Sequence, residues 1–326
     1  MGISLLSSQN ENPSGPRLVE ICVKGKWLSF PTLEACGQTI VIKGKLIKIA
    51  ALDDEQFAEN EVVNPDGCIE RVREQRHIAR ADIFSFAQKL PSITPRYQYP
   101  MELESIAVAQ TGSFTEWWEG LPQESRKNVR RSQKRGVTIG LHAFDDELIR
   151  GISDVQNESP FRQGRKYPHY GKSFEQVKRL HSGIIDRSDF ICAYFEGRII
   201  GFLKLVYRGG IASILQLNSM LAHYDKRPSN ALLAEAVKLC EAKSIGQLTY
   251  GRFNYGNKRD SSLRQFKTRN GFKELLVPRY YVPLNSWGRL CVSAKLYRGL
   301  FDILPPEVIA ALLTARDKWN ARRVAK

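Results

Sequence analysis

The chain has 326 residues, and 49 lysine and arginine residues against 34 aspartate and glutamate residues give it a formal charge of +15. Its hydrophobic content of 42% is too high for a disordered chain, and no apolar run reaches the ~18 residues that a membrane-spanning helix needs. The six cysteines stand singly, without a CxxC pair or a nearby pair of histidines, so we expect neither a disulfide framework nor a metal site. The sequence therefore indicates a basic α/β protein of the cytoplasm, long enough for two domains.

The first third of the chain is rich in short β-branched runs. Residues 1–16 are polar and predict a flexible tail. Glycine-separated apolar runs predict strands at 18–23, 39–42 and 46–51, with a hairpin turn at Lys43-Gly44. Composition then favours a helix at 68–81, a strand or helix at 83–88, and a buried strand at 106–109.

The middle of the chain changes to helical spacing. Phe114, Trp117, Trp118 and Leu121 recur at the period of a helix, and Pro122 interrupts it. A second helix is predicted at 123–135, where Gly136 ends it.

The second half predicts a clear order of elements. Apolar runs at 190–195, 199–207 and 211–220, joined by the turns Glu196-Gly197 and Gly209-Gly210, predict a three-stranded antiparallel meander. The remaining predicted elements are a loop at 225–230, a helix at 231–242, a strand at 247–250, a helix at 262–269, strands at 272–277 and 280–284, and a helical tail at 286–326.

This β-β-β-α-β-α-β order resembles the core of the GNAT acyltransferases. Three stretches make the chain resemble more closely the Fem-type peptidyltransferases and related acetyltransferases with duplicated GNAT-like units: the basic run 126–137, Pro-Ser-Asn-Ala-Leu-Leu at 228–233, and Tyr-Gly-Arg-Phe-Asn-Tyr-Gly at 250–256 with Asn-Gly-Phe at 270–272. The resemblance implies an α/β fold with a mixed sheet flanked by helices. It implies a degenerate N-terminal unit at 17–145, an intact acyltransferase unit at 146–285, and a helical extension at 286–326.

The resemblance also implies a donor site. GNAT enzymes bind pyrophosphate at a (Gln/Arg)-x-x-Gly-x-(Gly/Ala) loop, where this chain has Lys226 and, in place of the glycine, Ser229. A helix N-terminus still offers free N–H groups to an anion, so acyl-CoA, most simply acetyl-CoA, is the expected co-substrate. The expected cofactor-binding residues are Lys226, Arg227, Ser229, Asn230 and Phe266.

Two residues are expected to act in catalysis. Many GNAT enzymes have a tyrosine four residues before the late glycine, but here that position is Lys267, as in the Phe-Lys pair of Fem-type enzymes. By resemblance Lys267 would stabilise charge on the acyl donor, since a lysine is a compact cation with three donors. Tyr255, in the loop after a strand, is the expected hydrogen-bond donor or proton shuttle; packing in that loop is the alternative.

Basic residues predict the acceptor site. The predicted helix 123–135 carries six cations and only one acidic residue, Glu124. A bound anion would relieve the repulsion between the cations, so we expect Arg126, Arg130 and Arg131 to bind substrate. A solvated surface helix is the alternative. The loop residues Arg162 and Arg165, with Asn254, complete the expected substrate-binding set, although the loop also reads as an exposed linker. His169 and His223 could deprotonate an amine, but an ordinary hydrogen-bonded role is the simpler interpretation.

Together these features predict an N-acyltransferase that moves an acyl group from acyl-CoA to an amine of a cell-envelope or polysaccharide precursor, lipid-linked or nucleotide-linked. One alternative is a Fem-type peptidyltransferase that uses aminoacyl-tRNA, although the chain lacks the coiled-coil heptads of the helical arm that such enzymes often carry. The other is a non-catalytic module that binds polyanions.

The C-terminal segment has an apolar stripe, at Val308, Leu312, Ala315 and Trp319, followed by basic residues. Such a stripe allows peripheral contact with an anionic membrane, and packing on the core is the alternative.

Overall fold

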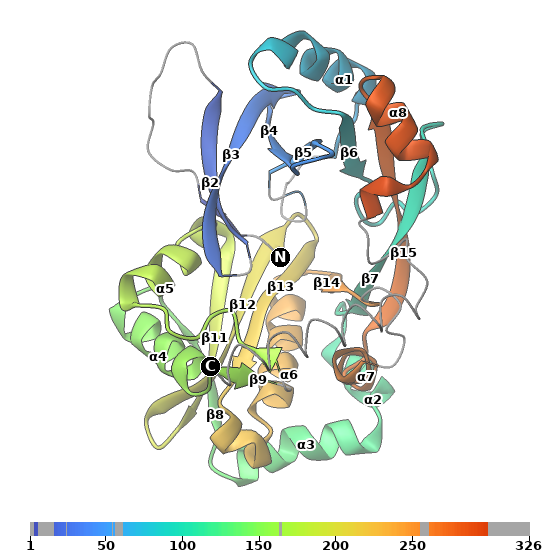
Figure 1. Cartoon of the computed structure of the whole chain (residues 1–326). Coiled ribbons are helices and arrows are strands. Elements are labelled where there is room, and N and C mark those ends of the chain that lie inside the picture. The colour runs from blue at the N-terminus through green and yellow to red at the C-terminus, as the bar shows by residue number, and fades with distance from the viewer. Residues whose placement is uncertain are drawn as a thin grey trace, which may run out of the picture.

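A computed structural model describes residues 3–5, 16–23, 25–53, 55, 61–162, 165–254 and 261–298 (Figure 1). Its strands are β1 (Ile3–Leu5), β2 (Arg17–Val23), β3 (Lys26–Ala35), β4 (Gln38–Lys43), β5 (Ile49–Leu52), β6 (Ile83–Ala87), β7 (Met101–Gln110), β8 (Thr138–His142), β9 (Phe161–Arg162), β10 (Arg165–Lys166), β11 (Ser188–Phe195), β12 (Arg198–Arg208), β13 (Ile211–Ser219), β14 (Gln247–Arg252) and β15 (Lys273–Pro283). Its helices are α1 (Pro65–Glu74), α2 (Phe114–Gly120), α3 (Gln123–Lys134), α4 (Asp146–Asn157), α5 (Phe174–His181), α6 (Pro228–Ala242), α7 (Ser262–Arg269) and α8 (Ser286–Ser293), with short 3-10 turns that include η3 (Leu221–Lys226).

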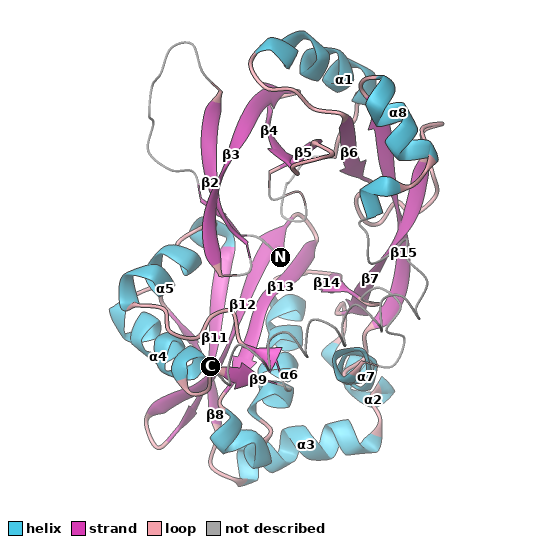
Figure 2. Cartoon of the chain, in the orientation of Figure 1, coloured by secondary structure: helices cyan, strands magenta, loops and turns pink. Residues whose placement is uncertain are grey.

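One mixed sheet runs through the molecule in the order β1-β2-β3-β4-β5-β6-β15-β7-β14-β13-β12-β11-β8 (Figure 2). The same pattern occurs twice in it. Strands β3, β4 and β5 are antiparallel, and after α1 the strand β6 pairs parallel to β5. Strands β11, β12 and β13 are antiparallel, and after α6 the strand β14 pairs parallel to β13. The predicted α/β class, with a mixed sheet and two related units, is confirmed.

The cores do not follow the predicted division at residue 145. Strand β15 lies between β6 and β7, so the last strand within the described residues joins both halves. Trp117 and Val129, from α2 and α3, are buried in one cluster with Leu232 and Leu233 of α6. Helices α4 and α5 cover the opposite face of β11 and β12. The units 17–145 and 146–285 therefore remain a proposed description, in which α2 and α3 contribute to the core of the second unit.

Most predicted elements of the second half are confirmed, and several differences have a local cause. Strand β3 was not predicted, because Pro31 and the polar residues around it break the alternation of apolar side chains. The two predicted closing strands are one strand, β15, which continues through Pro278 opposite Leu103. Helix α6 already begins at Pro228, inside the predicted loop 225–230. In the predicted tail 1–16, Ile3–Leu5 pairs with β2.

The C-terminal prediction is partly covered by the structure. Helix α8 forms the start of the predicted helical extension 286–326. The stripe from Val308 to Trp319 lies outside the described residues. Within the described ranges, no helix combines the length and the apolar character that a bilayer crossing requires.

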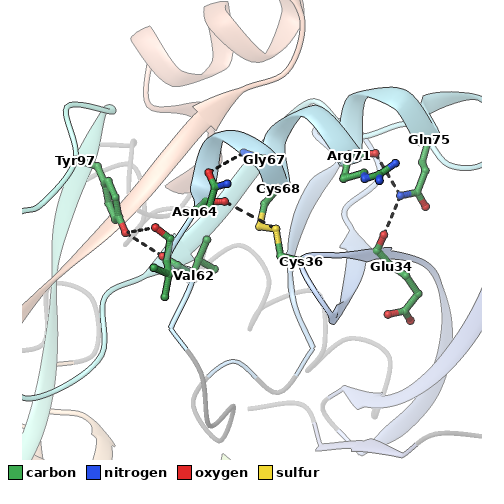
Figure 3. The surroundings of a disulfide bond; sticks show 10 residues. Glu34, Cys36, Val62, Asn64, Gly67, Cys68, Arg71, Gln75 and Tyr97 are labelled. Atoms are coloured by element: carbon green, nitrogen blue, oxygen red, sulfur yellow. Dashed lines mark hydrogen bonds between the residues drawn. A yellow bond between two sulfur atoms is a disulfide. The ribbon is translucent and has the colours of Figure 1, made fainter.

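The expectation of no disulfide is wrong. Cys36, which follows β3, and Cys68 of α1 form a disulfide, with their Cα atoms 5.5 Å apart (Figure 3). They are 32 positions apart in the chain, so spacing alone gave no sign of the pair. Tertiary packing brings them together, because Asn64 accepts a hydrogen bond from Gly67 at the start of α1 and Gln75 at its end donates to the Glu34 carbonyl of β3.

The β2–β3 hairpin contacts the far side of the second unit. The Lys172 ammonium donates to the Gly25 carbonyl at the hairpin turn, at 3.0 Å. The Arg179 guanidinium of α5 pairs with Glu20 and lies 4.2 Å from the centre of the Trp27 ring. The two ends of the sheet are therefore joined through α5 and the loop before it.

Candidate functional site

The candidate site is a splay between two parallel strands of the second unit. Strands β13 and β14 pair only over Ile211–Ser213 and Gln247–Thr249. Beyond that point β13 stays with β12 as far as Ser219, whereas β14 stays with β7 as far as Arg252. The carboxyl ends of the two strands therefore diverge, and ligands of α/β sheets bind outside such ends.

Lys267 of α7 lies at the β14 side of this splay. Its side chain is fully buried, and its Nζ donates to the carbonyl oxygens of Tyr250 and Arg252, each at 2.6 Å. The ammonium is also 4.6 Å from the centre of the Tyr250 ring. Burial lowers the pKa of Lys267 to about 8, so near neutral pH most of its ammonium is protonated and a cation is held at the splay.

The end of α7 is fixed by two of the motifs that the sequence singled out. Gly271 has a φ of +83°, and a Cβ there would lie 2.7 Å from Nε1 of Trp117. That indole nitrogen donates to the Asn270 carbonyl at 3.2 Å. The Trp-rich helix and the Asn-Gly-Phe turn are therefore one packing unit, in which only glycine fits.

The predicted cofactor-binding residues Asn230 and Phe266 meet at the same place. The Asn230 amide donates to the Asn270 side chain at 2.9 Å, and the Asn270 amide donates to the Phe266 carbonyl at 2.7 Å. Asn230 is buried, and Phe266 packs against the core of α6. In this arrangement Asn230 and Phe266 tie α6 to α7.

The N-terminus of α6 offers few donors to an anion. Arg227, at the N-cap, has a φ of +56°, and Pro228 has no N–H. The backbone amide of Asn230 donates to the Arg227 carbonyl, so two of the first three residues of α6 have no N–H to offer an anion. The Ser229 hydroxyl bonds the Ser219 hydroxyl at 2.9 Å. The site lacks the run of free N–H groups that a glycine-containing pyrophosphate loop provides.

The predicted cations Lys226 and Arg227 contact aromatic rings. The Lys226 ammonium lies 4.5 Å from the centre of the Phe195 ring, and the Arg227 guanidinium lies 4.4 Å from the centre of the Tyr224 ring. Lys226 also faces Asp225, which pairs with Arg135. Both cations therefore lie beside the start of α6, where each already contacts an aromatic ring.

Helix α3 carries the predicted substrate-binding arginines along this end of the molecule. Its start is tied to α7 by the Ser125 hydroxyl, which donates to the Arg269 carbonyl, and its end reaches the loop before α6 through Arg135. Arg130 is exposed and lies 5.5 Å from the Trp118 ring, and Arg126 and Arg131 are half-buried. The basic face of α3 therefore extends from the end of α7 to the start of α6.

The other predicted substrate-binding residues are divided between two places. Arg162 lies at the β13 side of the splay, where its guanidinium donates to the Ser219 carbonyl at 2.8 Å. Arg165 pairs with Arg162 through the backbone of β9 and β10, and its side chain lies outside the described residues. Asn254 follows β14 and donates to Glu274 at 2.7 Å. Tyr255 lies outside the described residues.

Tyr167, which lies beside Arg162, and Gln216, which lies beside Tyr167, were not among the predicted site residues. The Arg162 guanidinium is 4.6 Å from the centre of the Tyr167 ring, and the Tyr167 hydroxyl faces Gln216. Gln216 is in the middle of a predicted strand, where nothing in the sequence marks it. A β-bulge between Ile214 and Gln216 turns its side chain toward the α4–α5 face of the sheet, the face of its partner Lys204.

A cavity of about 750 Å³ lies elsewhere, between α4 and the β11–β12 turn. Arg150, Glu196, Arg198 and His223 are among its lining residues, and of the residues considered from the sequence only His223, a possible base, lines it.

Comparison with known proteins supports the fold. No family model matches the chain, and no curated protein matches its sequence. Among solved structures, the chain is similar to FemX, with 10% identity, a TM-score of 0.58, and coverage of 86% of this chain and 91% of that one. It is similar to L-PGS from Bacillus licheniformis, with 14% identity, a TM-score of 0.54, and coverage of 83% and 90%.

A third neighbour is the C-terminal domain of a putative lysylphosphatidylglycerol synthetase from Agrobacterium fabrum, with 16% identity, a TM-score of 0.54, and coverage of 82% of this chain and 88% of that one. Each match spans most of both chains, so the likeness covers both units rather than a single GNAT-like core. The predicted likeness of the fold to Fem-type proteins is thereby confirmed.

Proposed function

We propose that this protein is an N-acyltransferase whose donor binds at the splay between β13 and β14. The observation that carries the proposal is the buried Lys267 ammonium at the edge of that splay. In acyl transfer the amine lone pair attacks the acyl carbonyl carbon, the bond to the leaving oxygen or sulfur breaks, and the amine loses a proton. Negative charge develops on the carbonyl oxygen and on the leaving group. A cation held in place at low dielectric stabilises both.

Acyl-CoA remains the first donor to test, since it is the co-substrate that the GNAT resemblance implies. Two observations favour aminoacyl-tRNA as the second. At the start of α6, Pro228 has no N–H and the Asn230 amide donates to the Arg227 carbonyl, so neither is offered to a pyrophosphate. The basic face of α3 ends beside the start of α6, because Arg135 pairs with Asp225 there. This longer basic surface suits a polyanion such as tRNA.

The acceptor that we propose is an amine of a cell-envelope or polysaccharide precursor, carried on a lipid or a nucleotide. Two of the similar structures are named as lysylphosphatidylglycerol synthetase and L-PGS, which is why a lipid-linked acceptor belongs in the set to be tested. If the protein is instead a polyanion-binding module without activity, it will form no acyl product with any donor.

The test offers the purified full chain acetyl-CoA or a mixture of aminoacyl-tRNAs, with lipid-linked and nucleotide-linked amines, and searches for a new amide by mass spectrometry. We expect an amide with one donor. Lys267→Met should slow its formation by about 10²-fold or more. Lys238→Met is the matched control, because Lys238 lies on the exposed face of α6 and pairs with Glu235.

No amide with either donor, together with polyanion binding that is the same in Lys267→Met and in the unaltered chain, would refute the proposal in favour of the binding module. Circular dichroism of both variants separates loss of activity from loss of fold.

A further inference from the structure

Arg162 is a fixed cation whose buried Nε–H has no hydrogen-bond partner among the described residues. Its guanidinium donates to the Ser219 carbonyl at 2.8 Å and to the Val155 carbonyl at 2.7 Å, so it joins the end of α4 to the end of β13. Its Nε is shielded from solvent. A buried donor without a partner costs free energy unless a ligand or water accepts from it.

Glu158 compensates this charge only in part. The Glu158 carboxylate is 3.7 Å from the guanidinium. Its two oxygens accept hydrogen bonds from the backbone amides of Leu221 and Ala222, at 2.6 and 2.7 Å. The start of η3 therefore holds the Glu158 carboxylate. The Arg162 Nε–H can then donate to a different acceptor.

Other polar groups lie near the Arg162 guanidinium. The rings of Tyr167 and His169 are 5.3 Å apart, and Tyr167 faces Gln216. Nδ1 of His169 is inaccessible to solvent and has no partner within the described part of the chain. Behind it, His181 and Gln156 contact each other at 3.4 Å, and each keeps one buried polar atom without a described partner. We call Arg162, Tyr167, His169 and Gln216 the Arg162 cluster.

The charges that face the cluster are mainly positive. Lys172, whose ammonium is bonded to the Gly25 carbonyl, and Arg162 both act on His169. Burial, with these cations, lowers the pKa of His169 to about 4, so the imidazole is neutral near pH 7 and carries one N–H. Burial raises the pKa of Tyr167 to about 12, which keeps its hydroxyl protonated and able to donate.

We propose that the Arg162 cluster binds the carboxylate of the amine substrate, so that the acceptor is an amino acid or a peptide with a free carboxyl group; this rests on the proposed acyl transfer. The Arg162 Nε–H, the Tyr167 hydroxyl and one imidazole N–H are donors, and a carboxylate is a pure acceptor with two oxygens. A single fixed guanidinium suits one negative charge better than the two of a phosphate monoester.

The position of the cluster suits the reaction. Arg162 bonds the carbonyl of Ser219, and the Ser219 hydroxyl bonds Ser229 at the start of α6. A carboxylate on Arg162 would therefore place the amine of a short amino acid or peptide next to the end of β13, on the α4–α5 side of the splay. The donor would reach the same point from the α6 side.

The test measures binding without any donor. The full chain, labelled with ¹³C in histidine rings, is titrated with glycylglycine, with glycylglycinamide and with inorganic phosphate, and the ring signals of His169 are followed by NMR. We expect saturable shifts with glycylglycine and at least about tenfold weaker binding of the amide, which has lost the charged hydrogen bonds.

Arg162→Gln should abolish the preference for the carboxylate. Since Arg162 also holds α4 to β13, Tyr167→Phe is the second variant; it keeps the ring under the guanidinium, removes the hydroxyl and should weaken glycylglycine several-fold. Arg150→Gln is the matched control, because Arg150 lies on α4 outside the cluster. Equal binding of glycylglycine and its amide, tighter binding of phosphate, or no binding at all would overturn the proposal.

The two proposals can fail separately. Carboxylate binding without amide formation refutes only the acyl transfer, whereas amide formation that is equally fast with glycylglycine and glycylglycinamide refutes only the carboxylate site.

Discussion

At the scale of single residues, Lys267 makes stability depend on pH. Burial holds its pKa at about 8, below the ordinary 10.5 of lysine. Between pH 8 and 10.5 the unfolded chain binds more protons than the folded one, so this side chain adds stability as the pH rises through that window. Below pH 8 the ammonium is charged in both states, and its contribution no longer changes.

We therefore expect the unfolding free energy of the unaltered chain, relative to that of Lys267→Met, to rise from pH 8 to 10.5. Urea denaturation of both proteins at each pH measures this difference. The same difference for Lys238→Met should stay flat. A flat curve for Lys267→Met would show that its ammonium is as well solvated in the folded chain as in the unfolded one.

At the scale of elements, the Cys36–Cys68 disulfide fastens α1 to the end of β3. It closes a loop with a sequence separation of 32, and restricting such a loop in the unfolded chain is worth about 3–4 kcal/mol. Reduction should lower the unfolding free energy of the unaltered chain by about that much and leave a Cys36→Ser, Cys68→Ser variant unchanged.

Thiol counting in denaturant checks the pairing directly. The unaltered chain should show the four thiols of Cys22, Cys192, Cys240 and Cys291, all of which are buried in the fold. Six reactive thiols in the oxidised protein would contradict the pairing.

At the scale of the whole molecule, the contact of the β2–β3 hairpin with α5 joins the two ends of the sheet. Trp27 packs on the Arg179 guanidinium, and the hairpin turn accepts from Lys172. Trp27→Ala removes the ring, so the β2 and β3 amides should exchange hydrogen several-fold faster while those of β11 and β12 do not change.

Hydrogen exchange read by mass spectrometry makes this measurement. Arg150→Ala is the control, since Arg150 faces the Phe174 ring on the same pair of helices but does not contact the hairpin. Faster exchange throughout the sheet in Trp27→Ala would mean that the hairpin supports the entire fold rather than one contact.

Local patterns were sufficient for many elements from α2 onward. The meander over β11–β13, the helices α2, α3 and α7, and the turn at Gly271 follow from periodicity and from glycine and proline positions, which act over a few residues. The order of these elements also carried the resemblance that predicted the fold. Strand β3 was not found, because its alternation is broken by Pro31 and its exposed polar residues.

What the sequence by itself determined about this protein was therefore its class, most of its elements and the fold that their order implies. The tertiary structure alone decided which distant residues meet: Cys36 with Cys68, Trp117 with Gly271, and Arg162 with Tyr167 and Gln216. The physical reason is that pairing across a sheet and packing between helices depend on how the chain returns to itself. Composition and spacing report only on near neighbours.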